Sequence, residues 1–196
     1  MRREQELEAA LFDLDGTLVD TMPLHWEAYR RTLAKFGIDL TYEHFIAVAG
    51  GPAAAVIPML LQGKPIDASV QDIHQQKKAE TSRLLRERRP PTLETSKLLP
   101  FFWGHCKTAI VSSGSRSGVL ELLEAFDWHR KFEVIIAGDD VKWGKPHPEP
   151  FLSAAAALNA AAHRCLAFED SDAGIQSASA AGMLVYDVRK TTSAWR

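Results

Sequence analysis

Cysteine is scarce in this chain, and long apolar runs are missing. Only Cys106 and Cys165 occur among 196 residues, at a spacing that matches neither a disulfide framework nor a zinc site. No stretch approaches the roughly 18 apolar residues that a membrane helix needs. The charged N-terminus is not followed by the apolar segment of a signal peptide. We therefore expect a soluble, cytoplasmic protein.

The chain also lacks a strong excess of charge of either sign. The net charge is -2 and the pI is near 6.4, which gives no reason to expect nucleic acid or an anionic membrane as a partner. One basic cluster is best explained as a solvated helix end. It consists of Arg83, Arg86, Arg88 and Arg89. The length allows one good core and a small appended domain.

Five short apolar segments predict a buried parallel sheet. They are too short for helices and are bounded by polar or helix-breaking residues. Helix-like segments separate the last four, which is typical of an α/β fold with helices on both faces of the sheet. The expected strands are 9–14, 108–112, 134–137, 165–168 and 184–188, and the expected helices are 117–126, 148–159 and 173–181.

A long segment without a convincing strand separates the first two strands. It carries helix signals instead, because Thr21 and Thr41 can each cap a helix. A Gly-Gly-Pro sequence at 50–52 breaks the second helix, and a polar third helix is expected over 67–88. We predict a small helical domain inserted into the core. The expected boundaries are 1–20 and 93–196 for the core and 21–92 for the insertion.

Polar residues gather where the predicted strands end, which is the ligand-binding edge of a parallel sheet. Asp13 and Asp15 end the first strand, where residues two apart point the same way. Two close carboxylates indicate either a bound metal or a shared proton. The hydroxyl-rich turn at 112–115 suits phosphate oxygens. Lys145 follows the third strand and Glu169-Asp170 ends the fourth, and such hard oxygen ligands favour Mg²⁺.

Each of these features has an ordinary explanation when it stands alone. A DxD sequence can be a polar strand end, a Ser-Gly turn can be only a turn, and Glu169 with Asp170 can simply cap the next helix. Four carboxylates, a phosphate-sized turn and a lysine at successive strand ends are harder to explain separately. Together they predict an active site.

Four sequences in this chain resemble the successive motifs of the haloacid dehalogenase superfamily. They are FDLDGT, VSSGS, GKPHPEPF and FEDSDAGIQSASAAGM. The resemblance covers essentially the whole chain and is closest to the β-phosphoglucomutase-like branch, in particular the short fructose-1-phosphatase-like sugar phosphatases. It implies a Rossmann-like sheet in the order 3-2-1-4-5, with the inserted domain as a helical cap. It also implies a monomeric, Mg²⁺-dependent phosphatase acting on a small phosphorylated metabolite, in particular a sugar phosphate.

The resemblance assigns roles to individual residues. Asp13 corresponds to the nucleophile, Asp15 to the general acid and base, and Lys145 to the lysine that neutralises charge. The implied phosphate and substrate contacts are Ser113, Gly114, Arg116, Thr21 and His25, and the implied Mg²⁺ ligands are Asp13, Asp15 (through its carbonyl), Glu169 and Asp170. A carboxylate that attacks a phosphate ester must overcome like-charge repulsion, which a lysine and a divalent ion reduce.

Two other functions compete with hydrolysis. A phosphomutase needs a second phosphate site in the cap, and the family's usual arginine is missing after Gly50, although Lys64 and Lys78 remain. A non-catalytic binding or regulatory module would lack the nucleophile or a metal ligand, and this chain retains all of them. We also expect Trp143, beside Lys145, to pack against the protein and not to stack on a sugar. In the predicted strand order, Cys106 and Cys165 should stay free thiols.

Overall fold

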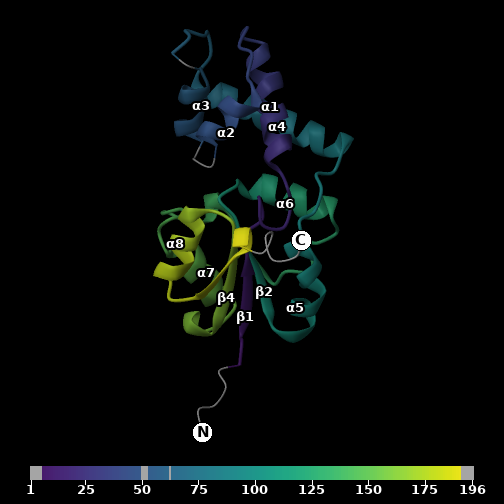
Figure 1. Ribbon diagram of the computed structural model, residues 1–196, viewed down its shortest axis with the longest axis vertical. Helices are drawn as coiled ribbons and strands as arrows, with labels where there is room; N and C mark the ends of the chain where they lie inside the picture. Colours follow the sequence, from purple (N-terminus) through teal and green to yellow (C-terminus); the bar gives the residue numbers. More distant parts are fainter. Residues whose placement is uncertain (1–5, 50–52, 62, 191–196) are drawn as a thin grey trace. The chain divides into compact units, whose positions relative to one another are not determined.

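The computed structural model describes residues 6–49, 53–61 and 63–190 (Figure 1). The chain divides into two compact units, each with its own hydrophobic core. The first unit comprises residues 1–20 and 91–196, and the second comprises residues 21–90. The predicted helix break at 50–52 lies outside the described residues.

The first unit is built on a parallel sheet of five strands in the order β3-β2-β1-β4-β5, which confirms the predicted fold class. Each strand coincides with one of the predicted apolar segments, with ends that differ by at most two residues. Leu11 of β1 pairs in register with Ala109 of β2 and Ala167 of β4, so β1 is central. The strands are β1 (Ala9–Phe12), β2 (Lys107–Val111), β3 (Val134–Ile136), β4 (Cys165–Glu169) and β5 (Leu184–Asp187).

Helices pack on both faces of this sheet (Figure 1). Alternate side chains of a strand point to opposite faces, and Leu11 packs with Phe151 of α7 in one core cluster. On the other face, the Phe12 ring stacks on Phe168 with centroids 4.7 Å apart and meets Phe102 of α5 edge-on at 5.6 Å. The helices are α5 (Leu99–His105), α6 (Arg116–Ala125), α7 (Glu149–Ala157) and α8 (Asp172–Ala180). Short 3₁₀ segments are Glu94–Leu98, Gly138–Asp140, Ala162–Arg164 and Val188–Lys190.

The second unit is all-helical in its described residues. Thr41 accepts a hydrogen bond from the His44 N–H at 3.2 Å and caps α2 as predicted. Thr21 precedes α1, but its backbone is helical and its side chain makes no capping bond within the described chain, so that prediction was wrong. The third predicted helix, 67–88, begins later than expected, at Val70, and Ser69 caps it. The helices are α1 (Met22–Ala34), α2 (Tyr42–Val48), α3 (Ala53–Leu61) and α4 (Val70–Glu87).

An ion-pair network joins α1 to α4 within this unit. Glu27 accepts from the guanidinium of Arg30 at 2.7 and 2.8 Å and also pairs with Arg31. Arg31 reaches Glu80 of α4 at 3.2 Å. Glu80 pairs in turn with Arg83. One arginine of the basic cluster therefore forms an ion pair on the surface of α4.

Both cysteines are free thiols, as predicted from the strand order. Cys106 immediately precedes β2 and Cys165 opens β4, and these two strands lie on opposite sides of β1. Within the described residues, no helix combines the length and the apolar character that a membrane crossing requires.

Candidate active site

Asp13 follows β1 at the carboxyl edge of the sheet. Its N–H donates to the Phe168 carbonyl at 3.0 Å, so the neighbouring strand fixes its backbone. The residue is 6% exposed. Its Oδ1 accepts from Lys145, whereas its buried Oδ2 has no hydrogen-bond partner among the described residues. Burial raises the pKa of Asp13 well above its ordinary value, Lys145 opposes this rise, and the charge of Glu169 adds to it.

Lys145 reaches the same point from the loop after β3, and its side chain is 5% exposed. Its Nζ donates to Asp13 Oδ1 at 2.7 Å, to the Val111 carbonyl at 2.8 Å and to Glu169 Oε1. These acceptors match the three donors of an ammonium group. Burial alone would lower the pKa of Lys145, but the charges of Asp13 and Glu169 raise it overall, so the lysine is charged at neutral pH.

Glu169 is the last residue of β4 and is fully buried. Its Oε2 accepts from the N–H groups of Asp170 and Ser171 at 3.1 and 3.2 Å, and from the Ser171 hydroxyl at 3.0 Å. Gly174 lies directly against this carboxylate, because a Cβ built there would approach it to 1.9 Å. A glycine is therefore required in the first turn of α8 for Glu169 to take this position.

Asp170 lies beside the turn that follows Asp15. Thr17, which is fully buried, donates to Asp170 Oδ1 at 3.2 Å. Gly16 has a φ of 89°, and a Cβ on it would lie 2.2 Å from Asp170 Oδ2. Burial and the neighbouring Glu169 raise the pKa of Asp170, while Thr17 lowers it. The sequence interpretation did not assign a role to Thr17, although it stands in the same FDLDGT motif.

Three carboxylates of this edge are close enough to share one cation. Ligand oxygens of Asp13, Glu169 and Asp170 all lie within 4.8 Å of one another. Lys145 balances only one of the three charges, and Asp13 Oδ2 lacks a partner among the described residues. The set contains only hard oxygen donors, which suit Mg²⁺. The residues therefore fit a magnesium ion.

The Asp15 side chain reaches the turn after β2. Its Oδ2 lies 3.4 Å from Ser112 Oγ, and the same Oγ accepts from the Gly114 N–H at 3.0 Å. Ser113, the predicted phosphate-binding hydroxyl, is exposed. Gly138 donates its N–H to the Gly114 carbonyl at 2.8 Å and holds the turn against β3.

Arg116 opens α6 just beyond this turn. Its guanidinium pairs with Asp140 and donates to the Ile135 carbonyl at 3.3 Å. Its N–H donates to Asp139 at 3.2 Å. Arg116 thus interacts with other residues of the protein. Its guanidinium would have to leave Asp140 and the Ile135 carbonyl to make the predicted contact with substrate.

Thr21 and His25, the other predicted substrate contacts, belong to the helical unit. Thr21 is 1% exposed. His25 Nδ1 lies 3.0 Å from Lys77 Nζ, and Lys77 lies 5.1 Å from the centroid of the Tyr29 ring. The sequence interpretation named Lys78 and missed Lys77. Helix α4 is polar, and its few apolar residues do not show which face is buried, so the two lysines could not be distinguished.

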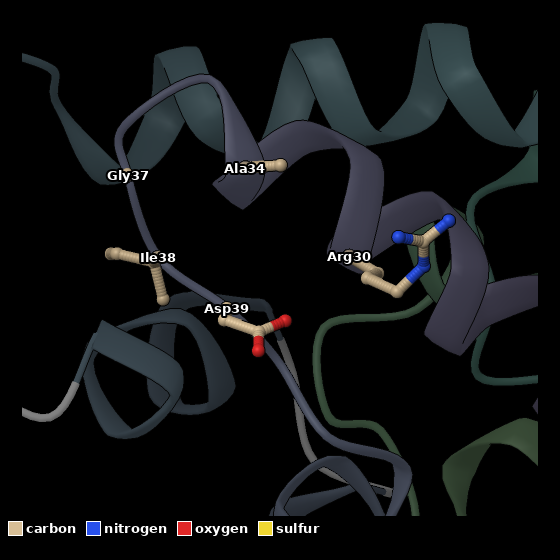
Figure 2. A pocket seen from close by; sticks show the side chains of 5 residues that line it. All are labelled: Arg30, Ala34, Gly37, Ile38 and Asp39. Carbon is tan, nitrogen blue, oxygen red and sulfur yellow. The ribbon is translucent and has the colours of Figure 1, made fainter.

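A shallow pocket of about 200 Å³ also lies in the helical unit. Figure 2 shows that its lining residues come from the end of α1 and the segment that follows it. Its charged lining groups are Arg30 and Asp39, which have opposite signs. Its lining residues include no cluster of carboxylates, unlike the edge of the sheet.

Trp143 does not pack as expected. It is 54% exposed, with Lys142 Nζ 5.0 Å from its ring centroid and the His147 ring 6.1 Å away. The carboxylate of Glu149 accepts the N–H groups of Lys142 and Trp143 at 2.9 and 3.0 Å. Because these backbone bonds hold the loop, the indole ring is not needed to anchor it.

The chain is similar to known hydrolases over most of its length. Residues 10–188 match the haloacid dehalogenase-like hydrolase family. A phosphorylated carbohydrates phosphatase of Thermotoga maritima is 34% identical over 181 residues, covering 90% of this chain and 82% of the relative. Fructose-1-phosphate phosphatase YqaB of Escherichia coli K12 is 34% identical over 182 residues, covering 91% and 95%. The crystal structure of CbbY from Rhodobacter sphaeroides in complex with phosphate has a TM-score of 0.80 at 29% identity, covering 91% and 84%.

Proposed function

This chain belongs to the haloacid dehalogenase-like hydrolase family and is an enzyme of the phosphoric monoester hydrolase type, and we propose that it is a Mg²⁺-dependent phosphatase that forms an aspartyl-phosphate on Asp13. The observation that supports this most strongly is the contact between Lys145 Nζ and Asp13 Oδ1 at 2.7 Å. A buried carboxylate paired with a lysine through one oxygen has its other oxygen available for attack on phosphorus.

In the first step, Asp13 Oδ2 attacks the phosphoryl group and the ester bond to the leaving oxygen breaks. Lys145 lowers the repulsion between the carboxylate and the phosphate. Asp15 donates a proton to the leaving oxygen, so the alcohol departs neutral. The Gly114 N–H and the Ser113 hydroxyl hold phosphate oxygens. Asp13, the Asp15 carbonyl, Glu169 and Asp170 would hold Mg²⁺, which would supply further charge neutralisation when bound.

In the second step, water attacks the phosphorus of the aspartyl-phosphate. Asp15, now deprotonated, takes a proton from this water, and the bond between Asp13 and phosphorus breaks. Inorganic phosphate leaves and Asp13 returns to its carboxylate form. The covalent intermediate divides one difficult displacement into two easier ones.

We propose a phosphorylated sugar as the substrate. Two relatives at 34% identity carry names that specify phosphorylated carbohydrates and fructose 1-phosphate. The helical unit would act as the cap, with Thr21 and His25 contacting the substrate. Lys77 of the same unit lies 3.0 Å from His25 and would place a positive charge beside it.

The second candidate is a phosphomutase of the β-phosphoglucomutase type. One observation favours it, because a β-phosphoglucomutase from Clostridium difficile has a TM-score of 0.77 at 26% identity. Lys77, which the sequence had not indicated, is a further basic residue of the helical unit that could serve such a site. The mutase nevertheless needs a second phosphate site, and Ala53, Ala54 and Ala55 supply no basic side chain after the glycines.

A phosphate-release screen tests the proposal. Purified protein is assayed with sugar phosphates, nucleotides and phosphoglycolate, with Mg²⁺ and with EDTA. We expect release of inorganic phosphate from at least one sugar phosphate only when Mg²⁺ is present. Release that is equal in EDTA would refute metal dependence. Turnover restricted to nucleotides would refute the sugar assignment.

A further inference from the structure

Ser112 follows β2 directly, and its hydroxyl lies between two groups of the candidate site. Ser112 is 3% exposed. Its Oγ accepts from the Gly114 N–H at 3.0 Å, and its O–H donates to Asp15 Oδ2 across 3.4 Å. A hydroxyl has one donor and two acceptor lone pairs, so it can serve both neighbours at once. Ser112 therefore connects the turn after β2 with the carboxylate after β1.

The backbone around this hydroxyl is fixed by the sheet and its edge. The Ser112 N–H donates to the Ile136 carbonyl at 2.9 Å. On the other side, the Gly16 N–H donates to the Val19 carbonyl at 2.8 Å, next to Asp15. With both backbones held, a change in the contact between Ser112 and Asp15 needs only side-chain rotation. Contacts that are long in a substrate-free site often tighten in the substrate complex.

Resting on the proposed phosphatase function, we propose that Ser112 is a positioning residue for both Asp15 and the Gly114 amide. Because the Ser112 O–H points to Oδ2, the acidic proton of Asp15 is held on Oδ1, from which it passes to the leaving oxygen. The Gly114 N–H bonds to the serine hydroxyl in the absence of phosphate. Incoming phosphate must take over that N–H, so Ser112 competes with phosphate for the amide.

This role differs from the one assigned to Ser113. Ser113 is exposed and is proposed to contact phosphate with its own hydroxyl. Ser112 is buried and acts on the reaction through Asp15 and Gly114. The two functions of its hydroxyl predict opposite effects when it is removed: weaker proton transfer and stronger phosphate binding.

The test compares Ser112→Ala with Thr108→Val. Thr108 lies on β2, is fully buried, and its hydroxyl is also 3.4 Å from its acceptor, the Lys131 carbonyl, so it is a matched control. We measure kcat and KM on the best sugar phosphate of the screen, and the affinity for inorganic phosphate by calorimetric titration with Mg²⁺. Thermal melting verifies that each variant is folded.

In Ser112→Ala we expect kcat to fall about tenfold, because Asp15 loses its positioning contact. Phosphate should bind roughly threefold more tightly, because the Gly114 N–H is released. Thr108→Val should change neither value. A wild-type kcat in Ser112→Ala, or weaker phosphate binding, would overturn the proposal. If the wild-type protein hydrolyses no ester, the proposed function fails, and the phosphate titration still decides the competition for the amide.

Discussion

Lys145 Nζ lies 2.7 Å from Asp13 Oδ1, while Asp13 Oδ2 is buried and has no hydrogen-bond partner among the described residues. The two oxygens of one carboxylate are thus in different environments. Lys145 holds Oδ1 and fixes the rotamer of the side chain. Oδ2 remains for attack on phosphorus, which is the asymmetry that a nucleophilic carboxylate needs.

Replacing Asp13 by asparagine should abolish turnover and preserve the fold. The change is nearly isosteric, but an amide is a poor nucleophile and a weak metal ligand. We expect kcat to fall by at least roughly a thousandfold. The thermal midpoint should not fall, because burial disfavours the charged form of Asp13 and the amide is neutral. Steady-state phosphate release and thermal melting check both points, and near-normal activity would rule out the covalent mechanism.

Magnesium should stabilise the wild-type protein through the carboxylates. At a concentration of about 100 Kd, the expected gain in unfolding free energy is about 2.7 kcal/mol. Gly174→Ala should lose most of this gain, because its Cβ would lie 1.9 Å from the Glu169 carboxylate. Calorimetric melting with Mg²⁺ or EDTA measures the difference.

Gly104→Ala is the control for that experiment. Gly104 also lies in a helix, and a Cβ built on it meets no described atom within 4 Å. It should retain the full response to Mg²⁺. An equal response in Gly174→Ala and wild type would contradict the assigned metal site.

The ion pairs of Glu27 should make part of the protein's stability depend on pH. Hydrogen bonds from Arg30 and Arg31 lower the pKa of Glu27 from 4.5 to about 2. A lowered pKa stabilises the folded state above the unfolded value, and this contribution is lost as pH falls from 4.5 towards 2. Because the network is partly solvent-exposed, we expect Glu27→Gln to cost about 1 kcal/mol at pH 7.

Urea unfolding of wild type and Glu27→Gln between pH 7 and pH 3 measures this dependence. The difference between the two proteins should shrink over the acidic part of the range. Glu43→Gln, an exposed glutamate of α2, serves as the control. A difference that stays constant with pH would show that the effect arises from packing and not from the charge of Glu27.

Hydrolysis and mutase activity differ in what the aspartyl-phosphate meets next. A mutase holds a sugar phosphate by its other phosphate, and loss of such a charged contact costs about 1.5–3 kcal/mol, roughly tenfold to a hundredfold in reorientation. We therefore expect inorganic phosphate as the main product from a hexose phosphate. Phosphorus NMR with β-glucose 1-phosphate, Mg²⁺ and a trace of the 1,6-bisphosphate checks this. Accumulation of glucose 6-phosphate with little free phosphate would show a mutase.

The sequence best predicted those site residues that lie at the ends of strands. Short apolar segments predicted the five strands, and parallel topology then brought Asp13, Lys145 and Glu169 to one edge. It did not predict residues whose role depends on a single contact with a residue far away in the sequence. Ser112 and Asp15 are 97 residues apart, and Lys77 and His25 are 52 apart, so neither contact leaves a local pattern.

Two short helices were missed for a related reason. α5 (Leu99–His105) follows Leu98, whose side chain cannot cap a helix, and α3 (Ala53–Leu61) contains Pro58, so neither carries a clear helix signal. In α5, Phe102 is held by its aromatic contact with Phe12 of the sheet, at 5.6 Å. Such tertiary packing stabilises a short helix whose own sequence does not specify it.

Chemical trapping of the intermediate tests the central claim most directly. The Mg²⁺-loaded protein is quenched during turnover of its best sugar phosphate and reduced with borohydride, which converts an acyl phosphate to an alcohol. Peptide mass spectrometry then locates the modified residue, with Asp13→Asn as the control. The account predicts homoserine at position 13 in the wild-type protein only during turnover. Steady phosphate release with Asp13 unmodified, or with the modification on another carboxylate, would contradict it.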